Sequence, residues 1–383
     1  MKIIIGSVIS IVPYSPGMAW NWMHHAVGFQ RLGHEVYYLE EVDPRWCVDS
    51  SGKPCRFEDS VNRRLFQSIM EHFGFMDRAC QVYHGGKATF GLSLDSLAAL
   101  CQETDLLLNI SGHIKLDLVL SSVRRRVYMD QDPVYTQLWL AEYGKDLNLG
   151  AHDAFLTVGL NIGTPYTPIP TGGVEWRHAL PPVVLEYWPA SAGPAVGHFT
   201  TIASWNGFRD LCYRGEWYRS KEEEFKRFAG LPGKVNQEFE AALRRHGPED
   251  EGVRLLRANG WVLTESSRIT DLAAYQEYIA RSRAEIGIAK NSYIKGGSGW
   301  FSDRTAHYLA SGRPALVQSS GIERHLPTGR GLLTFNTMEE AVAGVEQVNS
   351  DYNAHCGAAR EIAEEYLDYR KVLPKMLEDL HRR

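Results

Sequence analysis

A cluster of three glycines at residues 296–299 marks the stretch of this chain best suited to bind an anion. An apolar run at 284–289 precedes the cluster, and Ser302 and Asp303 follow it as residues that commonly begin a helix. Free N–H groups at the start of a helix, together with the positive end of its dipole, attract phosphate groups. We therefore predict a phosphate or diphosphate site at 296–304, with an ordinary strand-to-helix turn as the alternative.

The residues after this loop resemble a known family. The segments 308–317 (YLASGRPALV) and 326–333 (LPTGRGLL) are similar to the donor-binding half of GT-B glycosyltransferases, in particular the bacterial "glycosyl transferases group 1". The resemblance spans roughly residues 261–369. It implies an α/β fold of two Rossmann-like doubly wound domains that face each other across a cleft. It also implies transfer of a sugar from a nucleotide-sugar, most often of the UDP type.

The sequence departs from the family at one feature. Members often carry two glutamates eight residues apart that grip the ribose and the sugar. Gly299 and His307 occupy those positions here. The two carboxylates that usually bind the ribose and the sugar are therefore absent at these positions. Asp303 or His307 is expected to substitute for them.

The expected donor site combines residues near the glycine loop with residues from two upstream segments. Ser298, Gly299 and Arg304 would stabilise the departing diphosphate, and nearby lysines would add positive charge. Trp205 and Asn206 end the first strand expected in the second half of the chain. The full set is Trp205, Asn206, Lys221, Lys290, Ser298, Gly299, Trp300, Asp303, Arg304 and His307.

Sugar transfer also needs a base that takes the acceptor's proton. His24 and His25 lie near the start of the first expected helix, and Asp132 follows a later strand of the same half. An imidazole titrates near neutral pH, and a carboxylate bonded to it stabilises the charged form. Inverting GT-B enzymes place a histidine and an aspartate comparably, so we predict a catalytic His25–Asp132 pair, although helix geometry does not separate His24 from His25. The alternative is that these histidines cap the helix or pack in a loop.

Asp130-x-Asp132 also matches the D-x-D metal site of the other glycosyltransferase fold, where two carboxylates hold a divalent ion on the diphosphate. The two-domain layout argues against that fold. We therefore predict a metal-independent reaction with no cofactor besides the nucleotide-sugar.

Aromatic and imidazole side chains near the expected cleft are suited to pack against an acceptor. We predict Trp20, Trp22 and His24 as acceptor-binding residues. Burial in the core is the alternative for each of them.

The order of apolar runs, turns and amphipathic segments predicts two βαβ-type halves. Seven prolines between residues 161 and 194 argue against regular structure there. We predict an N-terminal acceptor domain at 1–178, a proline-rich linker at 179–198, a nucleotide-sugar-binding domain at 199–365, and a terminal helix at 366–383 that GT-B proteins fold back onto the first domain. Residues 237–245 are expected to form a helix, and Pro374 is expected to bend the last one.

Composition sets limits on partners. The 383 residues carry a net charge of −5 and include six cysteines without zinc or C-x-x-C spacing, typical of reduced thiols in the cytoplasm. We expect a nucleotide-sugar donor and a small-molecule or glycan acceptor as partners, and neither nucleic acid nor a membrane span. The oligomeric state is not indicated.

Two other functions fit the same pattern. A nucleotide-sugar epimerase of this architecture would act without an acceptor. A non-catalytic nucleotide-sugar-binding protein is suggested by the missing glutamate pair.

Overall fold

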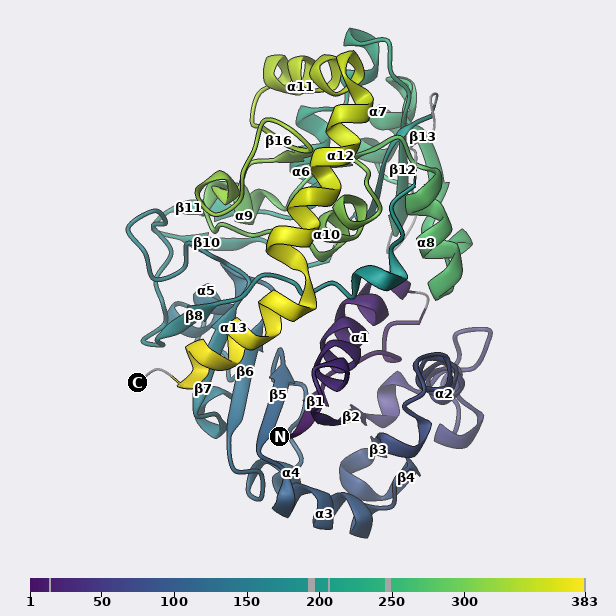
Figure 1. The fold of residues 1–383 in the computed structure, drawn as a ribbon, viewed down its shortest axis with the longest axis vertical. Coiled ribbons are helices and arrows are strands. Elements are labelled where there is room, and N and C mark those ends of the chain that lie inside the picture. The colour runs from purple at the N-terminus through teal and green to yellow at the C-terminus, as the bar shows by residue number, and fades with distance from the viewer. Residues whose placement is uncertain (14, 192–196, 206, 245–248, 382–383) are drawn as a thin grey trace.

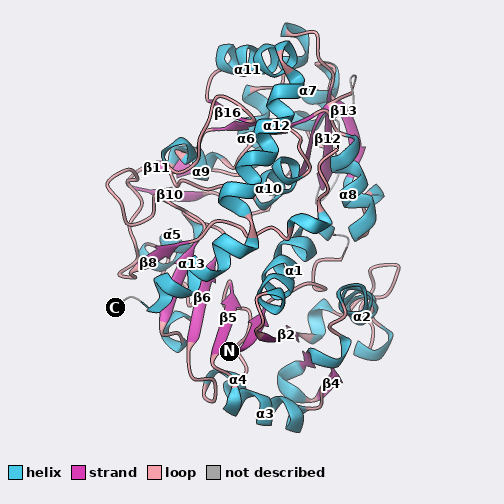
Figure 2. Ribbon diagram, in the orientation of Figure 1, coloured by secondary structure: helices cyan, strands magenta, loops and turns pink. Residues whose placement is uncertain are grey.

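The chain folds into two α/β halves in the computed structural model, which describes residues 1–383 except 14, 192–196, 206, 245–248 and 382–383. Each half contains a mainly parallel β-sheet surrounded by helices, and the halves lie one above the other along the long axis (Figures 1 and 2). The predicted α/β class with two doubly wound units is confirmed.

The N-terminal sheet has eight strands in the order β4-β3-β2-β1-β5-β6-β7-β8. All neighbours are parallel except β3 and β4, which form an antiparallel edge. Its central strands are apolar on both faces, as expected when helices cover both sides of a parallel sheet. The strands are β1 (Lys2–Gly6), β2 (Glu35–Val42), β3 (Ala79–Tyr83), β4 (Ala88–Gly91), β5 (Leu106–Ile110), β6 (Arg126–Asp130), β7 (Ala154–Thr157) and β8 (Trp176–His178), with helices α1 (Pro16–Arg31), α2 (Val61–Phe73), α3 (Leu94–Glu103), α4 (Asp117–Leu120) and α5 (Tyr135–Ala141).

The C-terminal sheet has six parallel strands in the order β13-β12-β9-β14-β15-β16. A small hairpin of β10 (Leu211–Tyr213) and β11 (Glu216–Tyr218) lies between the first strand and the first helix of this half. The sheet strands are β9 (Phe199–Ser204), β12 (Phe239–Arg244), β13 (Val262–Glu265), β14 (Ala284–Gly287), β15 (Ala315–Gln318) and β16 (Leu332–Phe335), and the helices are α6 (Lys221–Arg227), α7 (Glu251–Ala258), α8 (Leu272–Arg281), α9 (Asn291–Lys295), α10 (Asp303–Ala310) and α11 (Met338–Ser350).

The prediction of a helix at 237–245 is wrong, because β12 occupies most of this segment. Its residues Glu240, Ala241, Ala242 and Leu243 favour helices by intrinsic propensity. In the fold they are buried in a strand between β9 and β13. A strand buried on both faces does not show the alternation of polar and apolar residues by which strands are recognised. Tertiary packing has overridden local preference here.

The proline-dense stretch 161–194 contains more regular structure than expected. β8 pairs in parallel with β7 and forms the edge of the N-terminal sheet, and a 3-10 turn follows at Leu185–Tyr187. An edge strand needs partners on one side only, so prolines nearby are tolerated. The next sheet strand, β9, begins at Phe199.

The chain ends in α12 (Tyr352–Ile362), a π-helical turn (Ala363–Leu367) and α13 (Tyr369–His381). α13 lies against α1, where Leu373 fills the space that a side chain on Gly28 would need (yellow and purple in Figure 1). The helical path breaks at Asp368, whose ψ is 126° and whose carboxylate accepts the Arg370 N–H at 2.9 Å, and α13 continues through Pro374, where the sequence predicted a bend. Within the described ranges, no helix is both long and apolar enough to cross a membrane.

The halves join where the glycine loop meets the loop after β7. The Asn161 N–H donates to the Ser298 carbonyl at 3.0 Å, and the Asn161 side-chain amide donates to the Gly297 carbonyl at 2.9 Å. Gly299 has a φ of 69°, and a Cβ there would lie 2.8 Å from the Asn161 nitrogen. The backbones approach this closely only because residue 299 has no side chain.

We predict that Gly299→Ala lowers the free energy of unfolding by about 2–4 kcal/mol, because it combines left-handed strain with a backbone clash. Urea denaturation measures the loss. Gly163→Ala is the matched control, since Gly163 has a φ of 82° but its Cβ would meet only Thr171 at 3.7 Å. It should cost about 1 kcal/mol, and equal losses for the two variants would contradict the proposed contact.

Candidate active site

A cavity of about 630 Å³ lies between the two halves, at the carboxyl ends of both sheets. The N-terminal half contributes the loop after β1, the first turns of α1 and the loop after β6. The C-terminal half contributes the end of β9, the first residues of α6, the last residue of β12 and the start of α10. This is the place where open α/β sheets bind ligands.

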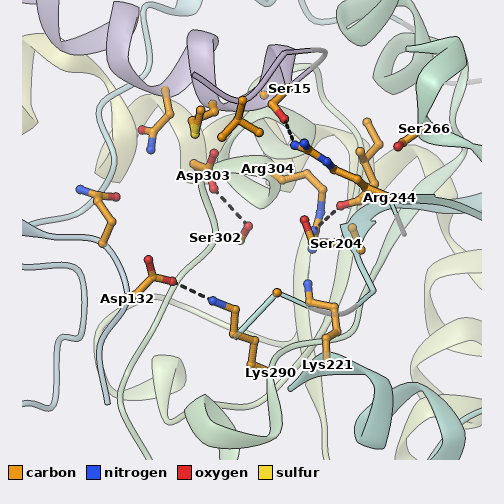
Figure 3. A pocket seen from close by; sticks show the side chains of 18 of the residues that line it. Ser15, Asp132, Ser204, Lys221, Arg244, Ser266, Lys290, Ser302, Asp303 and Arg304 are labelled. Atoms are coloured by element: carbon orange, nitrogen blue, oxygen red, sulfur yellow. Dashed lines mark hydrogen bonds and ion pairs between the residues drawn. The ribbon is translucent and has the colours of Figure 1, made fainter. Parts of the chain in front are cut away.

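Cationic side chains line this cavity from one half only. Lys221, Arg244, Lys290 and Arg304 all belong to the C-terminal half, and Figure 3 shows them around the same space. The N-terminal half contributes Asp132 from the opposite side. The cavity is therefore positive along its C-terminal wall.

Lys221 differs from the other three cations in having no direct partner. Its side chain is buried, with 7% of the residue exposed, and no ion pair or hydrogen bond reaches its amine from any residue that the structure describes. Burial lowers the pKa of Lys221 well below its ordinary value, and the charges of Arg304 and Lys290 lower it further, while the carboxylates of Glu285 and Asp303 oppose this shift in part. A buried ammonium group of this kind is costly unless an anion joins it.

The other three cations have partners that fix their positions. The Arg304 Nε donates to buried Glu285 at 2.7 Å, and one of its terminal nitrogens donates to the Ile202 carbonyl at 2.7 Å. The Arg244 guanidinium donates to the Ser15 hydroxyl at 2.5 Å. Lys290 donates to Asp132 at 2.7 Å, across the cavity.

The start of α10 also faces the cavity. Ser302 stands at the N-cap position, but its hydroxyl makes no capping bond to the first turn. The backbone N–H groups of Asp303 and Arg304 instead face the Asp303 carboxyl group. Asp303 projects beside Ser302 in Figure 3, with Arg304 nearby, and burial raises the pKa of its carboxyl group. The cations and the start of α10 together are suited to bind a multiply charged anion.

Only the second part of the predicted anion site at 296–304 lies at the cavity. Trp300, Phe301, Ser302, Asp303 and Arg304 line the cavity. Ser298 and Gly299 do not, because the glycine loop is covered by the loop after β7 and α9 precedes it. Its glycines serve the contact between the halves.

The structure does not bring His25 and Asp132 together. His25 is fully buried on α1, where its Nδ1 lies 3.0 Å from the Asn21 carbonyl, and burial lowers its pKa to about 4. Asp132 faces the cavity, and its Oδ1 accepts hydrogen bonds from Lys290 and from the Tyr293 hydroxyl, both at 2.7 Å. Among the two predicted catalytic residues, only Asp132 reaches the site.

Three other predicted site residues belong to the packing between α1 and α10. His307 stacks on Trp188, with ring centres 4.4 Å apart and 5° between the planes. Two N–H donors face the ring nitrogens of His24, from Val184 at 3.1 Å and Trp188 at 3.0 Å. Trp20 is fully buried beside them and donates to the Leu272 carbonyl. None of the three lines the cavity.

The remaining predicted residues divide as follows. Trp22, Trp205, Lys221, Lys290, Trp300, Asp303 and Arg304 line the cavity, whereas Asn206 lies outside the described residues.

The sequence analysis did not predict Arg244 and Tyr293, which also line the cavity. β12 places Arg244 beside Ser204 at the end of β9, and interpreting this segment as a helix hid that position. Tyr293 lies in α9, which the sequence did not suggest.

Comparisons with known proteins give structural neighbours only. No family model and no curated protein sequence matches the chain. An alpha-glucosyltransferase in complex with UDP matches with a TM-score of 0.61 at 11% identity, over 100% of both chains. The same enzyme with UDP and a 13-mer DNA matches at 0.59 and 12%, over 100% of this chain and 99% of that one. Anabaena HepE in complex with UDP-glucose matches at 0.58 and 13%, over 99% of both. The chain therefore has the GT-B fold, as its sequence resemblance suggested.

We predict that the free energy of unfolding falls as the pH drops below about 6.5. Burial lowers the pKa of His307 to about 3 and that of His25 to about 4. In the unfolded chain each histidine binds a proton below its ordinary pKa of about 6.5, whereas in the folded protein these two rings stay neutral. Each ring therefore lowers the free energy of unfolding by about 1.4 kcal/mol for every pH unit below 6.5. Replacing His307 by Phe should reduce that slope by one ring's share. Urea denaturation between pH 6.5 and 4 measures the slope.

Exposed His84 provides the control for this series. His84 has a φ of 48°, which asparagine tolerates, so His84→Asn should leave the slope unchanged. An unchanged slope in the His307→Phe variant would show that His307 is not held neutral in the core.

Proposed function

We propose that this protein is a glycosyltransferase that moves a sugar from a nucleoside-diphosphate sugar, most simply of the UDP type, to a hydroxyl group of an acceptor. Buried Lys221, which has no hydrogen-bond or ion-pair partner among the described residues and lies at the positive wall of a cavity between two GT-B halves, carries the proposal. Solved structures of the same fold whose titles name UDP or UDP-glucose support the choice of donor.

In this proposal the diphosphate occupies the space between Lys221, Arg244 and the first turn of α10. Both side chains lie on the same wall, and Arg244 is held by Ser15 at the start of α1. Lys221 and the helix dipole would stabilise the charge that develops on the leaving diphosphate. These groups supply the stabilisation that a metal provides in other transferases, so metal independence is part of the proposal.

Asp132 is the proposed base. Its Oδ1 is held by Lys290 and Tyr293, which leaves Oδ2 to accept the proton of an acceptor hydroxyl. The acceptor oxygen forms a bond to the anomeric carbon of the sugar. The bond from that carbon to the diphosphate oxygen breaks, and the nucleoside diphosphate leaves with its electron pair.

Asp303 is the proposed partner of the sugar. It is the carboxylate at the start of α10 that faces the cavity, whereas Gly299 and His307, at the family's glutamate positions, do not line it. A carboxyl group there can hydrogen-bond to hydroxyl groups of the transferred sugar.

We predict that Lys221→Met weakens UDP binding about ten- to a hundredfold, because a charge-assisted hydrogen bond to phosphate contributes about 1.5–3 kcal/mol. The same change should raise the free energy of unfolding of the unliganded protein by about 1 kcal/mol or more, since it removes an unpaired buried charge. Calorimetric titration with UDP and urea denaturation measure the two effects. UDP binding by the unaltered protein should also weaken as pH rises, because Lys221 with its lowered pKa loses its proton earlier than an ordinary lysine.

Lys226→Met on the same helix is the matched control. Lys226 is partly exposed and pairs with Glu222 at 2.6 Å, so its replacement should change neither UDP affinity nor stability by much. If UDP does not bind the unaltered protein, or binds Lys221→Met equally well, the proposed donor site is wrong.

We predict that Asp132→Asn lowers the rate of sugar transfer about 10²–10⁴-fold while UDP affinity changes little, because the amide cannot take up a proton. Release of UDP from the nucleotide-sugar in the presence of acceptor measures the rate. Asp77→Asn, at an exposed aspartate far from the cavity, should leave it unchanged. Chelation by EDTA should also leave it unchanged. Full activity of Asp132→Asn would assign the base elsewhere.

A further inference from the structure

The two walls of the cavity differ in chemistry. All four of its lysine and arginine side chains come from the C-terminal half. Over the described residues, the wall from the N-terminal half contains no lysine, arginine or histidine, and its single charged group is Asp132. If the positive wall holds the donor diphosphate, the acceptor meets the other wall.

That second wall is mainly apolar. Ile11, Val12 and Met18 contribute aliphatic surface from the loop after β1 and the start of α1. Trp22 is 6% exposed, and its Nε1 already donates to the Val8 carbonyl at 3.1 Å, so only ring carbons remain for a ligand. Trp46 ends a 3-10 turn after β2 and is 43% exposed at the cavity. An exposed indole beside an apolar wall is suited to stack on a ring.

Two polar groups on this wall match a hydroxyl group. The Nε2 of Gln131 is buried, and no acceptor atom of the described residues lies within hydrogen-bond reach of it. Asp132 is next in sequence, and both residues line the cavity. A hydroxyl oxygen would accept from Gln131 while its proton is donated to Asp132. The unused N–H and the carboxylate are thus complementary to one O–H group.

We propose that the acceptor is an uncharged, largely apolar ring compound that carries a hydroxyl group, with the ring against Trp46 and the hydroxyl between Gln131 and Asp132. The proposal rests on the proposed transferase function and specifies its acceptor. An anionic acceptor would lie beside Asp132, and Arg45, whose guanidinium lies 5.7 Å from the centre of the Trp46 ring, already pairs with Asp43 at 3.3 Å.

Nucleic acid fits this wall poorly. A structural neighbour is described with a 13-mer DNA, and that property belongs to the neighbour. Proteins that bind nucleic acid neutralise its phosphates with lysine and arginine, which the acceptor wall does not present among its described residues. The shared fold alone therefore does not make nucleic acid the acceptor of this chain.

The test compares two matched compounds on the UDP-loaded protein, 2-naphthol and 6-hydroxy-2-naphthoate. They share the ring and the hydroxyl group and differ by one carboxylate. We expect calorimetric titration to show at least tenfold tighter binding of 2-naphthol, and UDP-glucose turnover to be accelerated by 2-naphthol more than by the carboxylate or by duplex DNA containing hydroxymethyluracil. Equal binding, tighter binding of the carboxylate, or no binding of 2-naphthol overturns the proposal.

Two variants locate the compound. Trp46→Ala should weaken 2-naphthol binding about tenfold, and Gln131→Leu should weaken it several-fold, with UDP affinity unchanged in both. Trp217→Ala removes a tryptophan that is 51% exposed on β11 and does not line the cavity, so it should change neither affinity. Loss of 2-naphthol binding in Trp217→Ala, or none in Trp46→Ala, contradicts the assigned wall.

The outcomes separate the two levels of proposal. Absence of UDP binding, or UDP binding that ignores Lys221→Met, refutes the proposed transferase function itself. UDP binding that depends on Lys221, combined with preference for the carboxylate or the DNA, leaves the transferase function standing and refutes only the neutral acceptor.

Discussion

A lysine buried between two α/β halves is the constraint on which the site depends. Lys221 is desolvated, it lies near Arg304 and Lys290, and no carboxylate among the described residues pairs with it. Such an arrangement opposes folding, so the rest of the structure must hold it in place. The two sheets do so, because Lys221 begins a helix packed on one of them and the cations around it end or follow its strands.

The contacts between the halves keep the walls of the cavity at a fixed separation. On one side the glycine loop packs backbone to backbone on the loop after β7. On the other, Trp20, His24 and His307 join α1 to α10 through Trp188. α13 then returns to α1. Burial holds the two histidines neutral, so these aromatic contacts place no further charge near the positive wall.

Much of the fold was predictable because most elements carry local signals. β14 lies within the apolar run at 284–289, and Ser302 does stand at a helix N-cap. β12 was not predictable in this way, because Ala and Glu inside a buried parallel strand give no alternation. That error also concealed Arg244.

Residues of the candidate site were predictable where their place at the end of a strand or the start of a helix determines that they reach the cavity. Lys290, Asp303 and Asp132 follow strand ends and reach the cavity, as expected. His25 does not, because the side of α1 that faces the core is set by packing against other elements, and the sequence of one helix does not contain that information. The glycine loop was predicted to contact a phosphate for a related reason. Its glycines do permit a close approach, but the group that approaches them is a backbone segment.

Asp132 connects the two walls, and this connection explains why the halves need to be held together. Its ion pair with Lys290 crosses the cavity, so the proposed base is oriented by a residue of the donor half. Any increase in the separation of the halves would release the carboxylate from Lys290 and Tyr293 and remove the orientation of its second oxygen. Because the same two residues occupy one oxygen only, Asp132 keeps one acceptor site for a hydroxyl proton. In the proposed reaction, a residue of one half would thus orient the base that acts on an acceptor bound to the other half.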